Sequence, residues 1–568
     1  MKDPGTSVFQ ALAVDLFPES TKGEFLNSAQ IKNVCDTIIK PHNLTWASLQ
    51  SIAFEDDSLK YPRSGVFITL EAAIMSDLNV DIEGRVFTDN IAYLCDKLIQ
   101  NLQLKIPFDW NVCDESKDES MLILKYHLCL RIARALLYKL GEKRWHVQKE
   151  DLIKLMAACS YHADPYLPWV SNVNSRMVID FFKEHGNGLI EQNFERYIEM
   201  LKPDLLGSLN KSKTTNTLHN PHLSASGYSL AMIGKNKGNS GLKPKLGFSS
   251  TDMDNFTEDT RSDWKKSNKV RSISMIWFLM HTTLELGYFG SYVLLITSFV
   301  LNLLDDHEPQ FKKHGCILLR RLITLMELTP LENNFLVKTG LLDVFLRSLK
   351  TCLTYLPSFT PLELSYPLLS FAYPTTIKLL KLKSKVEGEK LGFVELVNNN
   401  ILSSLRLLQG NESLEEFNLV RLLMQQLHEV ISQHLQLDIL LCWSRVQYCL
   451  NQFLVNPFII EVGPEASHCI IVALEILNTL FSLFEGKSDK EGIRILLNYK
   501  YDFLGVYAIL FQRLEPYNVN VEVTNLCRIG YALLKRLVEY CGSKEIEELR
   551  KDVSLARLTN ESLKYLFT

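Results

Sequence analysis

The sequence lacks the features that would place the protein in several common functional classes. Its 568 residues carry a net charge of only −4, so it lacks the basic excess that nucleic-acid-binding proteins use to contact phosphates. It also lacks a basic N-terminus followed by a long apolar core, so no secretory signal is predicted. We therefore expect a protein of the cytoplasm and nucleus that does not bind nucleic acid.

A long uninterrupted apolar run is missing as well. The most hydrophobic window, residues 275–304, is broken by His281, Glu285 and two glycines. A membrane span needs about 20 mostly apolar residues. Buried helices are therefore favoured over a membrane segment, and a membrane-associated protein stays open as an alternative that detergent dependence would reveal.

Paired cysteines are absent. The twelve cysteines are scattered singly, without any C-x-x-C, and most lie in apolar helical patterns. In a reducing compartment such cysteines act as small hydrophobic residues, so we expect no disulfides. One mixed cluster has metal-ligand residue types, but its spacings match no zinc signature, and helical core or surface residues explain it better. The cluster comprises His428, His434, Cys442, Cys449, His468 and Cys469.

Catalytic motifs are absent too. The sequence contains no phosphate-binding glycine loop, no H-E-x-x-H, no nucleophile elbow and no calcium loop. Asp305 and Asp306 are adjacent carboxylates, but adjacent residues at a helix end point in different directions. A cap, or a link to basic residues of a neighbouring helix, is favoured over acid–base chemistry. We predict no enzyme, catalytic residue or cofactor; an enzyme whose site forms only on folding is the alternative.

Helical periodicity is what the sequence does contain. Apolar stripes recur at helical spacing, most clearly over residues 91–102, and hairpin or strand signals are weak. The fold class predicted is all-α. In the N-terminal region we expect helices at 28–40, 121–140, 148–160 and 175–184. Lys125, Arg131 and Arg134 are assigned to polar positions of the second of these helices.

A change of composition divides the chain. From Pro203 to about residue 270 the sequence is polar and rich in glycine and serine, and such a segment cannot bury enough apolar surface to offset its ordering entropy. We predict an N-terminal α-helical region (1–202), a linker or surface loop (203–270) and a C-terminal helical array (271–568). Two questions stay open: whether Trp264 docks or is exposed, and whether the hydroxyl-rich acidic runs 249–252 and 257–259 are phosphorylated.

Residues 288–327 organise the rest of the chain. A first helix should end at Asp305-Asp306, and a second should begin after Pro309. The second helix carries an apolar face formed by Gly315, Leu318, Leu319, Leu322, Ile323 and Met326. Its other face is assigned to Lys312, Arg320, Arg321 and Thr324.

The order of residue types across this pair is that of a HEAT-type repeat. An aspartate, Asp306, precedes the apolar-basic pair Phe311-Lys312 and the small Gly315. One helix pair cannot bury its apolar face alone and needs similar neighbours. We therefore predict an alpha-solenoid of HEAT/armadillo-like antiparallel helix pairs with a long polar central loop.

Proline marks the expected helix boundaries further along the chain. Thr360-Pro361-Leu362-Glu363, like residues 329–332, is predicted to form a capping box with threonine at the N-cap. Pro367 and Pro374 should kink or break the helix that follows. Gly463-Pro464 predicts another helix start.

The central segment also resembles a known family. Leu303-Leu304-Asp305-Asp306, followed by Phe311-Lys312, Gly315 and Leu318-Leu319, is similar to the characteristic segment of the Tti-two (Tel-two-interacting protein two) family. The similarity continues through residues 339–344 and 356–361 and covers mainly 277–382. We assign a structural role in the repeat to seven residues and no partner-binding role to any residue. The seven are Asp305, Asp306, Phe311, Lys312, Gly315, Leu319 and Leu322.

The resemblance implies a function. Members of this family are non-catalytic alpha-solenoid subunits of the TTT complex, together with Tel-two and Tti-one. With a heat-shock chaperone of the ninety-kilodalton class and its R2TP-type adaptor, they support newly made phosphatidylinositol-3-kinase-related kinases, including TOR and the DNA-damage kinases. The alternative is an unrelated HEAT or armadillo scaffold in transport or trafficking. Nearly balanced charge disfavours a nuclear-transport receptor, which would have acidic inner helices.

Overall fold

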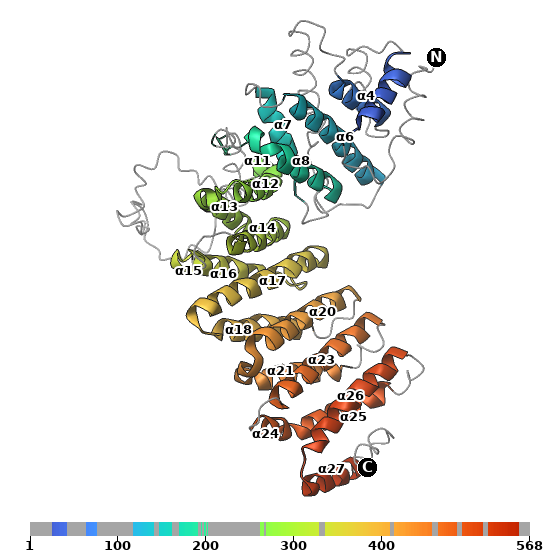
Figure 1. Cartoon of the computed structure of the whole chain (residues 1–568). Helices are drawn as coiled ribbons and strands as arrows, with labels where there is room; N and C mark the ends of the chain where they lie inside the picture. Colours follow the sequence, from blue (N-terminus) through green and yellow to red (C-terminus); the bar gives the residue numbers. More distant parts are fainter. Residues whose placement is uncertain are drawn as a thin grey trace, which may run out of the picture. The chain divides into compact units, whose positions relative to one another are not determined.

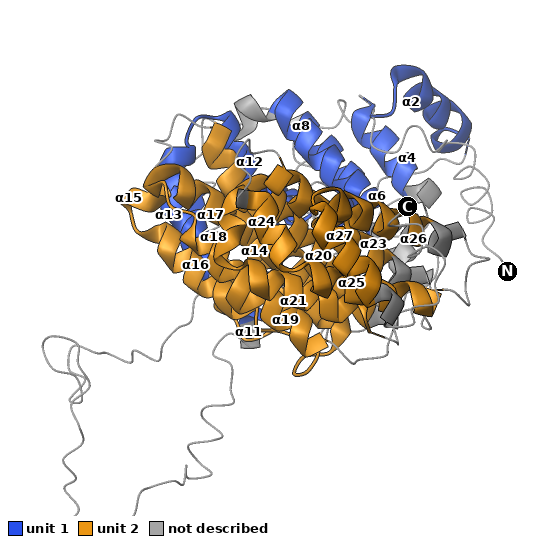
Figure 2. Cartoon of the chain, turned by 90° about the horizontal axis from the view of Figure 1, so that it is seen from below, with its two compact units in different colours: residues 1–302 blue, residues 303–568 orange. Residues whose placement is uncertain are grey.

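The computed structural model contains only helices among the residues that it describes, which confirms the all-α prediction (Figure 1). The chain divides into two compact units, Met1–Asn302 and Leu303–Thr568, coloured blue and orange in Figure 2. The described residues are 25–41, 64–76, 117–140, 147–161, 170–190, 195, 198–199, 202, 262–265, 268–328, 335–408, 414–456, 464–485, 491–514 and 521–555. The predicted stripe at 91–102, the polar segment 203–261 with its hydroxyl-rich runs, and the proposed cap at 329–332 lie outside them. The predicted boundaries at 202 and 270 therefore stay predictions.

The first unit is built from helices that the sequence patterns largely located. They are α2 (Ser28–Val34) with a π-helical turn (Cys35–Ile39), α4 (Ser64–Met75), α6 (Lys117–Leu140), α7 (Val147–Ala158), α8 (Asn172–Ile190), α11 (Ser262–Lys265) with a 3₁₀ turn (Asn268–Arg271), α12 (Ser272–Glu285) and α13 (Phe289–Leu304). The four predicted N-terminal helices are confirmed, and α8 extends further at its C-terminal end. A capping box between Asn27 and Gln30 starts α2.

Helix α6 lies at the centre of contacts in this unit. It packs on α4, α7 and α8, and α7 in turn packs on α12. The assignment of Arg131 and Arg134 to polar surface positions was wrong, because both side chains are buried beside Glu71 of α4. A helix surrounded on several sides has no solvent face left for them, so burial required a carboxylate partner instead.

Residues 275–304 form the greater part of α12 and all of α13, as the buried-helix interpretation predicts. Residues 272–280 of α12 are all buried. Trp264 docks: its ring meets Phe299 edge-on at 6.5 Å, and its Nε1 donates a hydrogen bond to Ser272 Oγ at 3.1 Å. Phe289–Leu304 is apolar but too short to cross a membrane, and among the described helices one window is both apolar and long enough, His468–Glu485. That window is 56% buried, as in the core helix of a soluble protein.

The second unit continues with a long series of helices. They are α14 (Pro309–Leu328), α15 (Phe335–Lys338), α16 (Leu341–Cys352), α17 (Leu362–Glu387), α18 (Leu391–Glu395) with a π-helical turn (Leu396–Ile401), α19 (Leu402–Leu408), α20 (Leu414–Glu429) with π and 3₁₀ turns (Val430–Leu435, Gln436–Leu441), α21 (Trp443–Leu454), α23 (Pro464–Glu485), α24 (Glu491–Asn498), α25 (Lys500–Leu514), α26 (Val521–Glu539) and α27 (Ser543–Leu555).

Within this unit, helices that are distant in sequence pack in a regular order. Contacts run from α14 to α17, then to α20, α23 and α26, which form a first row. Helices α16, α19, α21 and α25 each pack on members of that row, and α19–α21 and α21–α25 contacts join them into a second row. Figure 1 shows the helices of this unit following one another in chain order. The apolar core lies between the two rows.

Of the predictions about proline, the Thr360 capping box was wrong and the start of α23 is confirmed; α17 does not break at Pro367 or Pro374, and a kink there stays a prediction. Pro361 itself is the N-cap of α17, and no side chain caps this end, so Thr360 does not form the predicted capping box. Helix α17 also runs without a break through Pro367 and Pro374. Each proline removes a backbone hydrogen bond and costs about 3 kcal/mol. Burial of one side of α17, which includes Leu368, offsets this cost. Other buried residues of α17 include Leu369, Ala372, Tyr373 and Ile377. Pro464 begins α23 as predicted.

Candidate functional site

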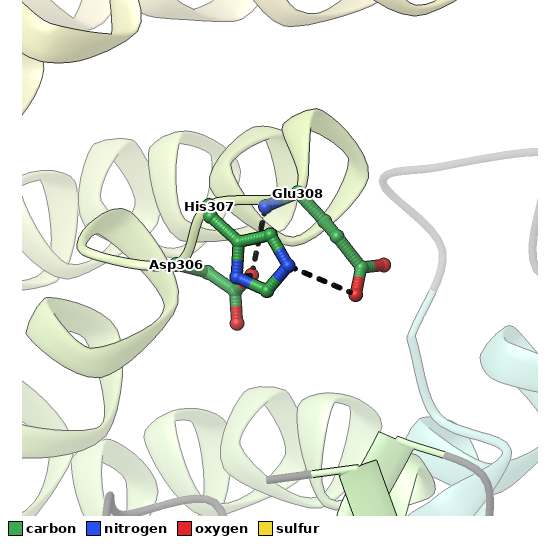
Figure 3. Close-up of side chains that lie close together, drawn as sticks. All are labelled: Asp306, His307 and Glu308. Atoms are coloured by element: carbon green, nitrogen blue, oxygen red, sulfur yellow. Dashed lines mark hydrogen bonds and ion pairs between the residues drawn. The ribbon is translucent and has the colours of Figure 1, made fainter. Parts of the chain in front are cut away.

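The turn between α13 and α14 contains the first part of the predicted motif. Asp306 is buried, and its Oδ1 accepts a hydrogen bond from the backbone N–H of Glu308 at 2.8 Å (Figure 3). An aspartate that holds the N–H two residues ahead forms an Asx-type turn. Pro309 then occupies the first position of α14, where its missing N–H is harmless. Asp306 therefore shapes the turn and starts the next helix.

Two other groups of the turn join it to helix α16 and the residues that follow it. The hydroxyl of Ser348 donates to Asp305 Oδ1 at 2.7 Å. The hydroxyl of Tyr355 donates to the carbonyl oxygen of His307 at 2.9 Å. The link from Asp305 to the neighbouring helix was expected to involve a basic residue, and its partner is a hydroxyl instead. Both contacts hold the end of one helix pair against the next.

Lys312 is the residue for which the sequence interpretation failed most clearly. It was assigned to the polar face of α14, but its side chain is only 4% exposed. Its Nζ donates to the carbonyl oxygen of Leu304 at 2.6 Å and to Thr351 Oγ1 at 3.3 Å. Leu304 ends α13, where backbone carbonyls have no partner in the helix and a positive charge is favourable. Lys312 thus caps the preceding helix from within the interior.

The remaining motif residues provide close packing. Phe311, Leu319 and Leu322 are fully buried or nearly so. A Cβ atom added to Gly315 would lie 2.9 Å from the backbone nitrogen of Leu304 and 3.0 Å from its side chain. Only glycine lets α14 approach the end of α13 this closely. Asp305, Asp306, Lys312 and Gly315 thus make contacts at this turn, and Phe311, Leu319 and Leu322 are buried along α14.

The same turn holds a possible metal-binding group. Among the described residues, Asp306, His307 and Glu308 form the one set of three metal-capable side chains with ligand atoms within 4.8 Å of one another. His307 lies between the two acids in Figure 3, with Nδ1 3.6 Å from Asp306 Oδ1 and Nε2 3.8 Å from Glu308 Oε1. Each ring nitrogen faces a different carboxylate, whereas one ion would use one of them. A histidine bridging two acids fits this geometry better than a metal site.

The histidine–cysteine cluster noted in the sequence does not gather at one point. His428 Nε2 lies 2.9 Å from Thr479 Oγ1, and His434 stacks on Phe393 with ring centroids 4.6 Å apart. Cys442, Cys449 and Cys469 are buried, and burial raises the pKa of the Cys442 and Cys449 thiols to about 11. Protonated thiols are poor metal ligands. The contacts of His428 and His434 and the burial of the three cysteines are those of helical core and surface residues, the interpretation that the sequence spacings favoured.

One buried ionic group escaped the sequence interpretation. Arg131 Nε and Nη2 donate to the two carboxylate oxygens of Glu71 at 2.6 and 3.1 Å, and Arg134 Nη2 lies 3.6 Å from the same carboxylate. Arg134 also lies 3.7 Å above the ring of Phe25, and burial lowers its pKa to about 10. The signal in the sequence was Glu71 itself, a lone acid within the apolar run of α4.

A groove with an apolar floor opens in the second unit. It lies between α16, α17 and α18 and has a volume of about 570 Å³. Leu346, Leu380 and Leu396 are among the residues that line it, and charged side chains of all three helices surround the opening. Several of the titratable groups around it pair with one another, and no nucleophile–base pair lies among the lining residues.

The described residues form only helices, and polar side chains such as Asp305 and Lys312 join neighbouring helices. A model of the Tti2 family matches residues 155–461 of the chain, and the chain belongs to this family. The resemblance stated from the motif is thereby confirmed. The matched segment includes both the 305–312 turn and the groove. No curated protein sequence matches the chain.

Proposed function

We propose that the protein is a non-catalytic scaffold subunit of the TTT complex, bound to Tel-two and Tti-one. In this role it supports the maturation, stability and assembly of phosphatidylinositol-3-kinase-related kinases, among them TOR and the DNA-damage kinases. The chaperone and its R2TP-type adaptor are indirect partners. The family match over residues 155–461 is the observation that carries this proposal.

The arrangement of the second unit supports a scaffold role. Its two rows of helices, with contacts that repeat from α14 through α26, are what an alpha-solenoid of HEAT-like pairs requires. Polar side chains link successive first-row helices on the surface: Lys378 Nζ donates to Thr324 Oγ1 at 2.6 Å, and Arg536 binds Glu485. An array in which each helix packs mainly on its neighbours leaves a long surface for contact with other proteins. A cytoplasmic and nuclear location belongs to the same proposal.

Affinity purification of the tagged full chain at native expression level tests the first part. We expect both Tel-two and Tti-one to be enriched over a tag-only control and to elute with the chain as one species in size exclusion. Recovery of neither subunit from cells that express both contradicts the proposal.

Acute depletion of the chain tests the second part. We expect the abundance of the related kinases to fall over several protein half-lives while their messenger RNA stays constant, because the proposed role acts on newly made protein. Pulse labelling separates new from old kinase. Unchanged abundance of newly made kinase contradicts a role in maturation, even where the complex itself forms.

A further inference from the structure

In the second row α16 is followed by α19, which continues directly from α18 and its π-helical turn. Within the described residues 335–408, α16 packs on α15 and α17 but makes no extensive contact with α18 or with the π-helical turn that continues it. Further along the row, α19 packs on α21 and α21 packs on α25 directly. The groove of about 570 Å³ lies between α16 and α18.

The floor of the groove is apolar and is made by helices from both rows. Leu346 comes from α16, Leu380 from α17 and Leu396 from the π-helical turn. Leu391 of α18 lines the edge and is 58% exposed. Leu380 fills the space beside Gly392, where a Cβ atom would lie 2.7 Å from its Cδ2. Leu346, Leu380 and Leu396 are already buried, so a partner with an apolar face would pack against this floor and would remove chiefly Leu391 from water.

The two sides of the groove differ in charge. Asp343 of α16 pairs with Lys383 of α17 at 2.8 Å, and this hydrogen bond raises the pKa of Lys383. That pairing leaves Arg347 and Lys350 as the cations of the α16 side. On the opposite side, the acids at the α17–α18 corner lie at the edge of the groove. They are Glu387, Glu389 and Glu395.

Little holds the two sides together. Lys350 Nζ lies 3.4 Å from Glu395 Oε2, and these side chains are 64% and 61% exposed. Exposed ion pairs of this kind contribute about 0–1 kcal/mol, so opening this one costs little. Arg347 and Glu389 form no ion pair with any described residue, and they present opposite charges on opposite sides of the groove.

We propose that this groove binds an amphipathic helix of a partner protein, which lies across its opening between α16 and α18. The apolar stripe of that helix packs on Leu346, Leu380 and Leu391. One flank carries acidic residues that face Arg347, and the other flank carries basic residues that face Glu389. Grooves lined in this way recognise helices through apolar residues at i, i+3, i+4 and i+7, and opposite charges on the two flanks fix the direction of the bound helix.

This inference rests on the proposed function, since the partner that supplies the helix is taken to be a subunit of the same complex. The test therefore uses the full chain co-expressed with Tel-two and Tti-one. Leu391→Asp is compared with Leu407→Asp, a leucine of α19 that is 57% exposed and does not line the groove. Both positions are exposed, so neither change should unfold the chain, and a melting curve of each variant checks this.

We expect Leu391→Asp to weaken subunit binding by roughly tenfold or more, as loss of an apolar anchor residue does, and Leu407→Asp to leave it unchanged. Arg347→Glu should weaken binding by about tenfold, with Arg406→Glu of α19 as its control. Equal binding by the parent and all four variants overturns the groove proposal while the proposed function stands. Failure of the parent chain to bind either subunit removes both.

A photo-reactive amino acid at position 391 identifies the occupant. We expect a crosslink to a segment of Tel-two or Tti-one that has an apolar helical stripe between an acidic and a basic flank. Reversing an acid of that flank to arginine should restore binding to Arg347→Glu. A crosslink to a second copy of the chain, to another segment of the same chain, or to no polypeptide at all overturns the proposal.

Discussion

The two units place their charged side chains in different environments. In the first unit, Glu71, Arg131 and Arg134 form an ionic group in the interior between α4 and α6. In the second unit, the ion pairs between described helices keep both side chains at least partly exposed, as in Lys350–Glu395 and Lys383–Asp343. Lys312 is buried in the second unit too, but it donates to a backbone carbonyl and a hydroxyl. The same residue types therefore have different energetic consequences in the two units.

This comparison shows why charge in a helical pattern is a poor guide to exposure. Removing one member of a buried ion pair leaves an uncompensated charge and costs about 3–5 kcal/mol, whereas exposed pairs contribute about 0–1 kcal/mol. A helix row with an open outer face can keep its charges in water. A helix such as α6, packed on three neighbours, has to pair them internally. The predictions below test this difference from the largest expected effect to the smallest.

The largest effect is expected in the second unit's core. Leu319→Asp puts a carboxylate at a fully buried position of α14, which should destabilise the unit by roughly 4 kcal/mol or more or force the carboxyl to stay protonated. Leu328→Asp, at the exposed end of the same helix, should change stability by less than about 0.5 kcal/mol. Hydrogen exchange of α14 and α17 peptides measures both. Equal protection in the two variants would show that this face of α14 is not a core.

Glu71→Gln should destabilise the first unit by about 3–5 kcal/mol, because Arg131 and Arg134 then lose the carboxylate that faces them in the interior. Glu395→Gln breaks an exposed pair in the second unit and should cost less than about 1 kcal/mol. Hydrogen exchange of α4 and α6 in the first variant, and of α16 and α18 in the second, measures each change. Similar losses of protection in both variants would contradict the expected difference between the buried ionic group of the first unit and the exposed ion pair of the second.

Lys312→Met keeps most of the side-chain volume but removes the donor to the Leu304 carbonyl. A hydrogen bond to a charged group contributes about 1.5–3 kcal/mol, so a destabilisation of this size is expected, with the loss of protection concentrated at the end of α13. Lys338→Met, at the end of short α15, is a lysine control on the same unit. Selective loss at the 305–308 turn supports capping, and a uniform change across the unit does not.

Gly315→Ala and Gly505→Ala should have opposite signs. The Cβ at residue 315 would meet the backbone of Leu304, and overpacking of this kind costs about 1–3 kcal/mol. Gly505 lies within α25 with nothing inside 4 Å of its added Cβ, so alanine should stabilise that helix by about 0.5–1 kcal/mol. The shifts in melting temperature of the two variants measure this. Stabilisation by Gly315→Ala would show that the α13–α14 contact is loose.

The smallest effect concerns pH. Burial lowers the pKa of His434 below its ordinary value of 6.5, with Lys381 and Lys390 adding to the effect. Because the unfolded chain then binds the proton more readily, the stability contributed by the neutral ring is fully present above pH 6.5 and is lost as pH falls through the lowered folded value. His434→Phe keeps an aromatic ring against Phe393 and should melt with a weaker pH dependence between pH 7 and 5. Parallel curves for parent and variant would exclude His434 as the cause.

Local sequence patterns located individual elements well. Helical periodicity found α6, α7 and α14, and Gly463-Pro464 located the start of α23. Local patterns could not decide that α17 runs unbroken through Pro367 and Pro374, because the burial that compensates each proline comes from other helices. Trp264 likewise could not be placed from its polar surroundings, since its partner Phe299 lies 35 residues away.

The sequence by itself determined that this protein is helical, that it belongs to the family of its central motif, and which residues of α14 form its apolar face. These properties depend on spacing and residue type within one segment. Only the tertiary structure decided that Lys312, Arg131 and Arg134 are buried and that α16 and α18 are separated by a groove. Burial and grooves depend on how several helices pack against one another, and no single helix's pattern records which neighbours it will have.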